Sequence, residues 1–566
     1  MVFPAPGTRF GAALLLVLAG CRSAGPMPPS PATTGPLDLV IEGGRIVDGT
    51  GNPWFHGDLG IRQGRIVVVA PAGTLRATTA TERIDARGQV VAPGFIDIQS
   101  HSRDALLNGD GRVVSKVTQG ITTEIMGEGA TNAPQNDRTG GEPSHDFRGP
   151  RGFNRWLEAM AGRGASVNLG SFVGASTVRM YAKGMAQGRA TPAELDSMRM
   201  VVRQAMEDGA FGIASALIYP PGNYASTEEL VEISKAMAPF GGVYITHMRS
   251  EADAWLPAID EALRIGRDAR VPVEIYHLKA GGRRNWHKTS VAIAKIDSAR
   301  AAGQDVQANM YAYIAGGTGL SSCLPPWAAA DGKLFANLRD PSTRTRIRQE
   351  MDRVQDEWEN LCQLSTPEGV LVLGLIKPEN RAFIGKRLAG IAGETGREWQ
   401  EAVMDLLISE EQRIGTVYFM MGEDQVATKM RQPWMKFGTD AGGVDPDSAR
   451  GLVHPRAYGN YPRILGHYVR ERGVLTLEEA IRKMSSAVAT RLSISDRGVL
   501  RPGMWADVVI FDPATVADHA TFERPHQLST GIRDVFVNGA AVVRNGRHTG
   551  AKPGMIVRGP GWRGPR

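Results

Sequence analysis

Apolar, β-branched runs alternate with amphipathic segments along most of the chain from about residue 94 onward. This alternation favours a parallel sheet, because each helix returns the chain so that the next strand starts in the same direction. Eight such strands predict an α/β fold of the (β/α)8, TIM-like barrel type, with its chemistry at the C-terminal strand ends. The predicted strands are Phe95–Ser100, Ile121–Met126, Val167–Val173, Phe211–Leu217, Val243–Thr246, Val271–Tyr276, Asp305–Tyr311 and Met435–Thr439.

Helices are expected between several of these strands, where apolar residues recur at i, i+3 and i+4. The clearest start is at Thr191, which is predicted to cap a helix with Pro192 in its first position and Glu194 near its third. The predicted helices are Thr191–Asp208, Thr227–Ala238, Ala254–Ala269, Thr289–Ala302, Pro341–Cys362 and Arg397–Ser409.

The two ends of the chain are rich in strands and glycine turns instead of strand–helix units. We expect residues 37–92 and 500–559 to combine into one small β-sandwich domain beside the barrel. The barrel itself then comprises residues 93–318 and 434–499. The stretch 319–433 interrupts the barrel rhythm and is too long for a structureless loop, so we expect an inserted subdomain over the active site.

The N-terminus has the features of an export signal. An apolar run over 11–20 follows Arg9 and is too short to span a bilayer, so residues 1–20 are predicted to be a signal peptide. The run ends in Leu-Ala-Gly-Cys, which resembles the bacterial lipobox and predicts lipidation of Cys21, with residues 21–36 as a lipidated tether. We expect a lipoprotein on the periplasmic face of a bacterial membrane, which it touches only through the lipid anchor. An ordinary cleaved signal with a chance cysteine is the alternative.

Composition and charge restrict the class of protein further. Apolar residues make up 42% and charged residues 22% of the 566 residues, which excludes wholesale disorder. The net charge of 65 − 59 = +6 and the lack of a dense basic block argue against nucleic-acid binding. Apart from Cys21, the chain contains Cys323 and Cys362, which either form a disulfide or remain as two free thiols.

Polar side chains stand at the tips of several predicted strands. His101 follows the first strand, His247 and His277 end the fifth and sixth, and Asp440 ends the eighth. Neutral imidazoles are good zinc ligands, and a neighbouring carboxylate can accept a proton from water. A single histidine in such a place is more often an ordinary hydrogen-bonded residue, but this repetition at strand ends predicts a metal-dependent hydrolase.

Several longer motifs give the chain a family resemblance. The motifs are PGFID at 93–97, KVTQGITTEIMGEG at 116–129, GAFGIASALIYPPG at 209–222, THMRSE at 246–251, HLKAGG at 277–282, FGTDA at 437–441, HPRAYG at 454–459, and KMSSAVATRL through DRGVLRPGMWADVVIFDP at 483–513. With these motifs the sequence resembles the amidohydrolase superfamily and, within it, the N-acyl-D-amino-acid deacylase (D-aminoacylase) family, over nearly all of residues 38–559.

The resemblance also implies roles for individual residues. Asp440 would be the general base and later the proton donor, and Arg456 would grip the substrate α-carboxylate. The resemblance implies His247 and His277 as zinc ligands, with His101, in the family's His-x-His, as a further metal-ligand candidate. It also implies substrate contacts at Lys279, Tyr219, Tyr311 and Tyr313, for which packing along the mouth of the barrel is the alternative.

Two departures from the family pattern affect the metal site. The first histidine of the family's His-x-His is Gln99 here, so we expect the outer metal position to be weak or empty. Where the family carries a metal-bridging cysteine, the chain has Glu128. We therefore expect Glu128, His247 and His277 to hold one zinc ion per chain.

The function implied is zinc-dependent hydrolysis of N-acyl-D-amino acids to a carboxylate and a free D-amino acid. One alternative is hydrolysis of another linear or cyclic amide, as in dipeptidases and hydantoinases. A second alternative is a metal-free lipoprotein that binds such ligands without turning them over, which Gln99 would favour.

Overall fold

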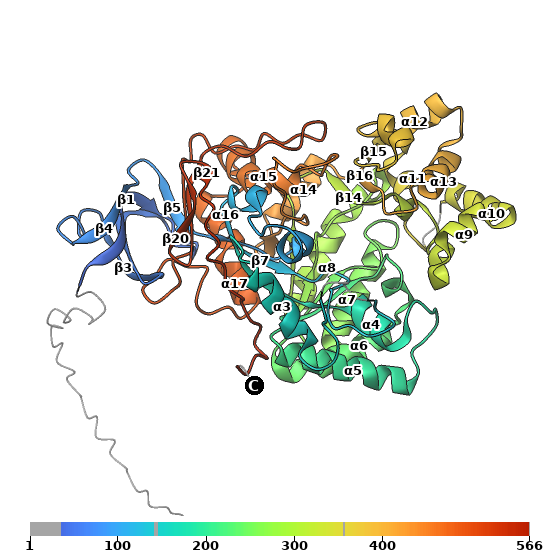
Figure 1. Cartoon of the computed structure of the whole chain (residues 1–566), viewed down its shortest axis with the longest axis horizontal. Helices are drawn as coiled ribbons and strands as arrows, with labels where there is room; N and C mark the ends of the chain where they lie inside the picture. The colour runs from blue at the N-terminus through green and yellow to red at the C-terminus, as the bar shows by residue number, and fades with distance from the viewer. Residues whose placement is uncertain (1–34, 141–144, 355–356, 565–566) are drawn as a thin grey trace, which may run out of the picture. The chain divides into compact units, whose positions relative to one another are not determined.

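The computed structural model describes residues 35–140, 145–354 and 357–564. The chain divides into two units, Met1–Gly35 and Pro36–Arg566, and the helices and strands described below all belong to the second (Figure 1). The predicted signal peptide and Cys21 lie outside the described residues. None of the helices among the described residues is both long and apolar enough to span a membrane.

Parallel strands supply the centre of the large unit, in two hydrogen-bonded groups. One group has the order β6-β7-β8 and the other β17-β13-β12-β11-β10-β9, and every pairing within them is parallel. Each predicted strand is present, most of them shortened by one to three residues. The strands are β6 (Phe95–Asp97), β7 (Ile121–Met126), β8 (Asn168–Ser171), β9 (Val173–Gly174), β10 (Gly212–Ala216), β11 (Val243–His247), β12 (Val273–Ile275), β13 (Val306–Met310) and β17 (Met435–Phe437).

The two groups also meet at both of their edges. Only Phe172 separates β8 from β9, so the predicted third strand passes from one group into the other. On the opposite edge Ser100, after β6, forms a parallel bridge with Ala441, after β17. The amide of Asp440 also donates to the carbonyl of Gln99 at 2.8 Å. The ends of the first and last predicted strands are therefore joined.

Helices follow most of these strands, as the sequence predicts. The predicted capping box is present: the Thr191 hydroxyl accepts from the Glu194 amide, and the Glu194 carboxylate accepts from the Thr191 amide. The helices are α1 (Arg103–Leu107), α2 (Val114–Val117), α3 (Gly152–Gly162), α4 (Ala175–Lys183), α5 (Pro192–Glu207), α6 (Thr227–Met237), α7 (Trp255–Ala269), α8 (Thr289–Ala301), α15 (Arg456–Arg463), α16 (Leu477–Met484) and α17 (Ser486–Arg491).

Strands from both chain ends form one further sheet. Hydrogen bonds connect its nine strands in a single sheet of order β21-β20-β19-β18-β5-β1-β2-β3, with β4 against β1, rather than in two separate sheets. The central pairing of β18 with β5 joins the C-terminal strands to the N-terminal ones. The strands are β1 (Leu37–Ile46), β2 (Phe55–Arg62), β3 (Arg65–Pro71), β4 (Ala80–Asp85), β5 (Val90–Pro93), β18 (Val508–Phe511), β19 (Ile532–Val537), β20 (Ala540–Arg544) and β21 (Arg547–His548).

The segment between β13 and β17 has a small antiparallel sheet of order β14-β16-β15 and its own apolar core. We call this segment, residues 315–433, the insertion; it begins at the first residue of β14, slightly before the predicted boundary. Its elements are β14 (Ala315–Gly319), β15 (Val370–Val372), β16 (Gly415–Phe419), α9 (Leu334–Arg339), α10 (Pro341–Asp352), α11 (Leu361–Ser365), α12 (Leu388–Thr395), α13 (Trp399–Glu410) and α14 (Glu423–Met430).

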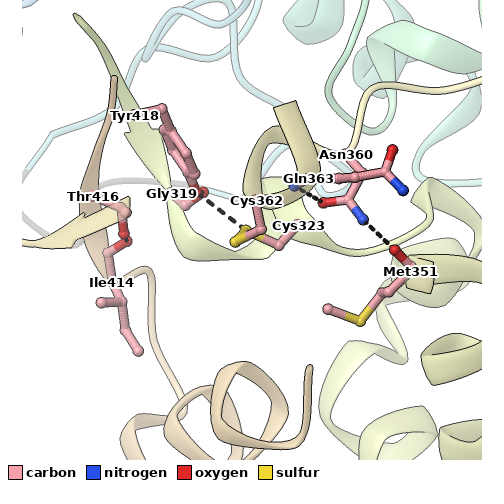
Figure 2. The surroundings of a disulfide bond; sticks show 9 residues. All are labelled: Gly319, Cys323, Met351, Asn360, Cys362, Gln363, Ile414, Thr416 and Tyr418. Atoms are coloured by element: carbon pink, nitrogen blue, oxygen red, sulfur yellow. Dashed lines mark hydrogen bonds between the residues drawn. A yellow bond between two sulfur atoms is a disulfide. The ribbon is translucent and has the colours of Figure 1, made fainter. Parts of the chain in front are cut away.

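One helix prediction in the insertion is wrong. The expected helix 341–362 is divided into α10 and α11, because Asn360 begins a new helix. Its side-chain oxygen accepts from the Gln363 amide, and its side-chain nitrogen donates to the Met351 carbonyl (Figure 2). A capping side chain of this kind satisfies the open amides at a helix start, so it favours a boundary there over a continuous helix.

Cys323 and Cys362 form a disulfide, which decides between the two alternatives that the sequence leaves open. The bond joins the 3-10 turn Leu320–Cys323 to α11 across 39 residues of sequence (Figure 2). Beside it, the Tyr418 hydroxyl donates to the Gly319 carbonyl at 2.9 Å. The cross-link therefore fastens the start of the insertion to its middle.

A buried ion-pair network ties the first and last parallel strands together. The Lys116 ammonium donates to Asp97 Oδ2 at 2.8 Å, to Thr439 Oγ1 at 2.6 Å and to the Ala441 carbonyl at 2.7 Å. Glu124 Oε1 lies 3.1 Å from the same nitrogen, and the side chains of this lysine and both acids are fully buried. Lys116 thus holds the residues on either side of Asp440.

Removing the disulfide should destabilise the insertion. Replacing Cys323 and Cys362 by alanine frees a 39-residue loop in the unfolded chain, which corresponds to a loss of about 2–4 kcal/mol in the unfolding free energy. Denaturant unfolding with and without reductant measures it: reductant should lower the midpoint of the natural chain and leave the variant unchanged. Two titratable thiols in the native, unreduced protein would contradict this expectation.

Removing the Lys116 charge should cost more than removing another buried lysine. Lys116→Met leaves Asp97 and Glu124 buried without their counter-charge, and we expect a loss of about 3–5 kcal/mol in denaturant unfolding. Lys483→Met is the matched control, because Lys483 is equally buried but donates to the carbonyls of Met430 and Gln432, and its ion-pair partner Glu479, at 3.7 Å, is partly exposed to solvent. An equal or smaller loss for Lys116→Met would contradict the assigned role of the network.

Candidate active site

Three metal-type donors converge where the parallel strands end. Glu128 follows β7, His247 ends β11 and His277 follows β12. Glu128 Oε1 lies 3.1 Å from His247 Nδ1 and 3.3 Å from His277 Nε2. All three side chains are largely buried, and their donor atoms lie within 4.8 Å of one another. The structure therefore brings together the three residues that the sequence predicts as ligands of one zinc ion.

Glu251, which was not among the predicted site residues, orients both imidazoles from behind. Its Oε1 lies 2.9 Å from His277 Nδ1, and its Oε2 lies 3.4 Å from His247 Nε2. A carboxylate on the outer ring nitrogen fixes the rotation of a ligating histidine and directs its other nitrogen to the metal. Glu251 stands four residues after His247 in THMRSE. The presence of this acidic residue inside the motif was the sequence signal that could have identified it as a site residue.

The charges around Glu128 keep it ionised. Burial raises the pKa of this carboxyl, but hydrogen bonds from His101, His247 and His277 outweigh burial and hold the pKa well below its usual range. Burial and the Lys279 ammonium lower the pKa of His277, while Glu251 and Glu128 raise it further, to about 9. The two carboxylates thus outweigh burial and the Lys279 charge at His277.

Gln99 donates a hydrogen bond to this centre. Its amide nitrogen donates to Glu128 Oε2 at 2.6 Å. Because a carboxylate only accepts hydrogen bonds, the amide must turn its NH2 group toward Glu128 and its oxygen away.

Asp440 follows β17 and lies between a histidine and an arginine. His101 Nε2 is 2.9 Å from its Oδ1, and Arg456 Nη1 is 2.9 Å from its Oδ2. Burial raises the pKa of Asp440, but the Arg456 charge and the His101 contact outweigh it, so the pKa is lowered. Its backbone has φ of 50°, a left-handed conformation that is uncommon for aspartate. Local contacts, including those of Lys116, therefore have to hold it in place.

His101, Glu128 and Asp440 form a second group of close donors. His101 is the most exposed of the three, and its Nε2 is 3.4 Å from Glu128 Oε2. His101 therefore lies beside Glu128 and Asp440, among the residues predicted to form the metal site. Because Asp440 belongs to this group, a cation there would occupy the carboxylate expected to act as base.

Arg456 is a buried cation with unused hydrogen-bond donors. Its guanidinium carbon lies 4.4 Å from the centroid of the Tyr311 ring, and Nη2 donates to the Gly317 carbonyl at 3.3 Å. Among the described residues, Nε and the buried Tyr311 hydroxyl make no hydrogen bond, and the contact of Nη1 is its ion pair with Asp440. Such groups are rare without a ligand or water to satisfy them. Their positions fit the binding of a carboxylate.

The remaining predicted substrate contacts divide into two groups. Lys279 donates to Glu251 at 2.6 Å, and the Tyr219 hydroxyl donates to Thr318 at 2.8 Å while its ring packs against His247. Both line the inner of two cavities that are described below. Tyr313 does not: its hydroxyl donates to Asp518 at 3.2 Å, and its ring packs against His454 and Phe522. The expected substrate contact from Tyr313 is therefore not supported by its position, because packing with the C-terminal segment turns it away.

Two adjoining cavities meet at Asp440. The inner one has a volume of about 590 Å³ and is lined by the three metal-type donors, Lys279, Tyr219 and Tyr311, with an apolar wall that includes Met180, Met185 and Ile218. The outer one has a volume of about 1150 Å³ and extends between Arg456 and the insertion. Asp440 and Thr318 line both. Together the two cavities have room for a substrate that extends well beyond its scissile bond.

The insertion touches the loop that carries Glu251. Glu359 Oε1 accepts from the Ser250 hydroxyl at 2.7 Å and from the Glu251 amide. Burial and the nearby Glu251 charge raise the pKa of Glu359 to about 7. The insertion thus both lines the cavity and holds the residue that orients the two histidines.

Comparisons with known proteins agree with this geometry. A family model described as "Amidohydrolase family" matches residues 386–543. D-aminoacylase of Alcaligenes xylosoxydans xylosoxydans is 35% identical over 528 residues, covering 92% of this chain and 98% of its own.

Two solved structures also match over almost the whole chain. One, from work on the binuclear metal centre of a D-aminoacylase, has a TM-score of 0.77 at 34% identity and covers 92% of this chain and all of its own. N-acyl-D-glutamate deacylase of Bordetella bronchiseptica, with zinc and a phosphonate inhibitor, has a TM-score of 0.76 at 32% identity and covers 93% of this chain and 100% of its own. The chain therefore belongs to the N-acyl-D-amino-acid deacylase (D-aminoacylase) family of the amidohydrolases.

Proposed function

We propose that this protein is a zinc-dependent hydrolase of N-acyl-D-amino acids, which releases a carboxylate and a free D-amino acid. The observation that carries the proposal is the buried Arg456 guanidinium with unsatisfied donors, next to Asp440 and the three metal-type donors. It combines a carboxylate-binding group with hydrolytic chemistry in one cavity. Family membership supports the same reaction.

The donor set fits a single zinc ion. Glu128, His247 and His277 offer one carboxylate and two imidazoles, which are ordinary zinc ligands, and three protein ligands leave a position for water or substrate. Zinc bound there would act as a Lewis acid and make a water molecule more acidic. We propose one zinc per chain, because Gln99 offers a donor where a second metal would need a ligand.

The chain's own residues supply the proton transfers and the binding of substrate. Asp440 takes a proton from the attacking water and later gives it to the departing nitrogen of the scissile amide. Arg456 holds the α-carboxylate through its free Nε donor, and the Tyr311 hydroxyl adds a second donor. The apolar wall of the inner cavity receives the acyl group, and the insertion covers the mouth and limits access of bulk water.

We also propose that the two parallel groups form one closed (β/α)8 barrel over residues 93–318 and 434–499. Contacts at both edges and a shared core support it: Ile96, Ile125, Phe172, Ala214 and Ile245 come from strands or strand junctions of both groups and belong to one buried cluster. Residues 37–92 and 500–559 form the small β domain, and the segment 319–433 forms the body of the insertion. The barrel brings the strand ends that carry the site to one face.

For its location we propose export as a lipoprotein to the periplasmic face of a bacterial membrane. The support is the sequence alone: the apolar run over 11–20 and the lipobox-like tetrapeptide that ends at Cys21. The lipid anchor would be its only attachment to the membrane, and its ligand would be a small N-acyl amino acid.

A metal-free binding protein remains the second candidate, favoured only by Gln99. A hydrolysis screen decides between the two: we expect turnover of N-acetyl-D-amino acids over their L-enantiomers and over cyclic amides, lost on dialysis against a chelator. Ligand binding without turnover in zinc-loaded protein would favour the binding protein. Turnover of hydantoins alone would favour a cyclic-amide hydrolase.

Zinc content should depend on Glu128. We expect about one zinc per chain after loading and dialysis of the natural protein, and a small fraction of that for Glu128→Ala, because one of three ligands is lost. Metal analysis after dialysis measures the content directly. His467→Asn is the control, because the contacts of His467 are with Glu423, Glu471 and the Tyr468 ring, away from the site. Equal zinc in natural protein and Glu128→Ala would contradict the assigned ligand set.

Removing the Arg456 guanidinium should weaken substrate binding through the α-carboxylate. For Arg456→Ala we expect kcat/KM on an N-acetyl-D-amino acid to fall by about 100-fold or more, since a buried charge-assisted pair is lost. An N-acetylated amine of equal size without the carboxylate serves as the control substrate. The variant should discriminate less between the two substrates than the natural enzyme, and unchanged discrimination would contradict the role of Arg456.

A further inference from the structure

The outer cavity carries an excess of positive charge that the reaction itself does not need. Its lining includes five arginines, Arg103, Arg381, Arg413, Arg450 and Arg456, and a single carboxylate, that of Asp440. Asp440 is already paired with Arg456 and His101. The cavity therefore presents a cationic wall to whatever enters it.

Three of these arginines lack ion-pair partners among the described residues. Arg413 donates to the Thr318 hydroxyl at 3.3 Å and Arg381 to the Ile376 carbonyl at 3.2 Å, and neither these two nor Arg450 pairs with a described carboxylate. Elsewhere in the insertion arginines are paired, as Arg344 is with Glu401 and Asp405. Unpaired arginines gathered on a cavity wall favour an anionic ligand.

Arg413 is the member of this group nearest to the reacting atoms. It precedes β16 and lines both the inner and the outer cavity. The Thr318 hydroxyl that it contacts also accepts from Tyr219 at 2.8 Å, and the ring of Tyr219 packs on His247 with 5.3 Å between centroids. Arg413 is thus linked to the metal centre through two hydrogen bonds and one ring contact.

Arg413 and Arg456 also contact consecutive residues of one strand, β14. Arg456 Nη2 donates to the carbonyl of Gly317, and Arg413 Nη2 donates to the side chain of Thr318, the next residue of β14. Consecutive residues of a strand advance by about 3.3 Å. Both arginines also line the outer cavity, so a substrate whose α-carboxylate is bound by Arg456 can present a second acidic group to Arg413 there.

We propose that the natural substrate carries a second carboxylate, which Arg413 binds. This inference rests on the proposed deacylase function and makes its substrate class more specific. The second carboxylate comes either from the side chain of an acidic D-amino acid or from the far end of a dicarboxylic acyl group. Arg413 acts on specificity and takes no part in the bond-breaking step.

The expected effect is moderate, because Arg413 is an exposed side chain. Solvent screens its interaction with a carboxylate, so we expect a preference of about tenfold in kcat/KM for the dianionic substrate over its neutral isostere. Since the interaction is electrostatic, the preference should decrease as the salt concentration rises.

The test compares isosteric substrates with the zinc-loaded, full-length enzyme. N-acetyl-D-glutamate is paired with N-acetyl-D-glutamine, and N-glutaryl-D-alanine is paired with its terminal amide. A preference for the acid in the first pair identifies the side chain as the source of the carboxylate, and one in the second pair identifies the acyl group. Arg413→Gln should abolish whichever preference is present, and Arg413→Lys should retain part of it.

Arg501→Gln is the matched control, an exposed arginine outside both cavities. Turnover of the neutral substrates with no preference for either acid, or a preference that survives Arg413→Gln, overturns the inference while the deacylase function stands. If no N-acyl-D-amino acid is turned over, the proposed function fails. Calorimetry then compares the natural protein with Arg413→Gln for the binding of N-acetyl-D-glutamate and of N-glutaryl-D-alanine. If the variant binds either ligand about tenfold more weakly, the inference is supported. If the two proteins bind each ligand with equal affinity, the inference is overturned.

Discussion

The buried Lys116 ammonium is the interaction on which the geometry of this site depends most. It joins Asp97 on β6 to Thr439 and Ala441, the residues on both sides of Asp440. Asp440 has a left-handed backbone conformation, which an aspartate adopts only where its neighbours are fixed. A fully buried charge is costly unless it is paired, so this lysine restricts the strand ends to arrangements that bring its partners together. Asp440 is thereby directed toward His101 and Arg456.

A second carboxylate organises the other half of the site. Glu251 faces the outer nitrogens of His247 and His277, and its backbone amide is held by Glu359 of the insertion. Two successive contacts therefore orient the metal-type donors: Glu359 of the insertion holds Glu251, and Glu251 holds the two imidazoles. The insertion also supplies Thr318 and Arg413 to the cavity wall. It takes part in the orientation of the site as well as in its enclosure.

Much of this was predictable because strand ends of a parallel sheet meet at one edge. That rule, with the motifs, predicts that Glu128, His247, His277 and Asp440 lie together, and Arg456 follows from the family resemblance. The strand-end rule did not find Glu251, which lies in a loop and was marked only by its place in THMRSE, and it could not predict that Gln99 would donate to Glu128. It was wrong about the helix 341–362, where the Asn360 cap overrides a continuous helical pattern. It also placed Tyr313 at the substrate, although Asp518, far away in sequence, draws its hydroxyl elsewhere.

The sequence by itself determined the order of strands and helices, the α/β class and the identity of the chemical groups, because periodicity and strand-end residues are local properties of the chain. Only the tertiary structure decided which groups meet: the pairing of Cys323 with Cys362, the stacking of Arg456 on Tyr311, and the contact of Arg413 with Thr318. These contacts join residues far apart in the chain, and their distances follow from how the sheets and the insertion pack. No local pattern encodes that packing, so the unused donors of Arg456 became visible only in the folded molecule.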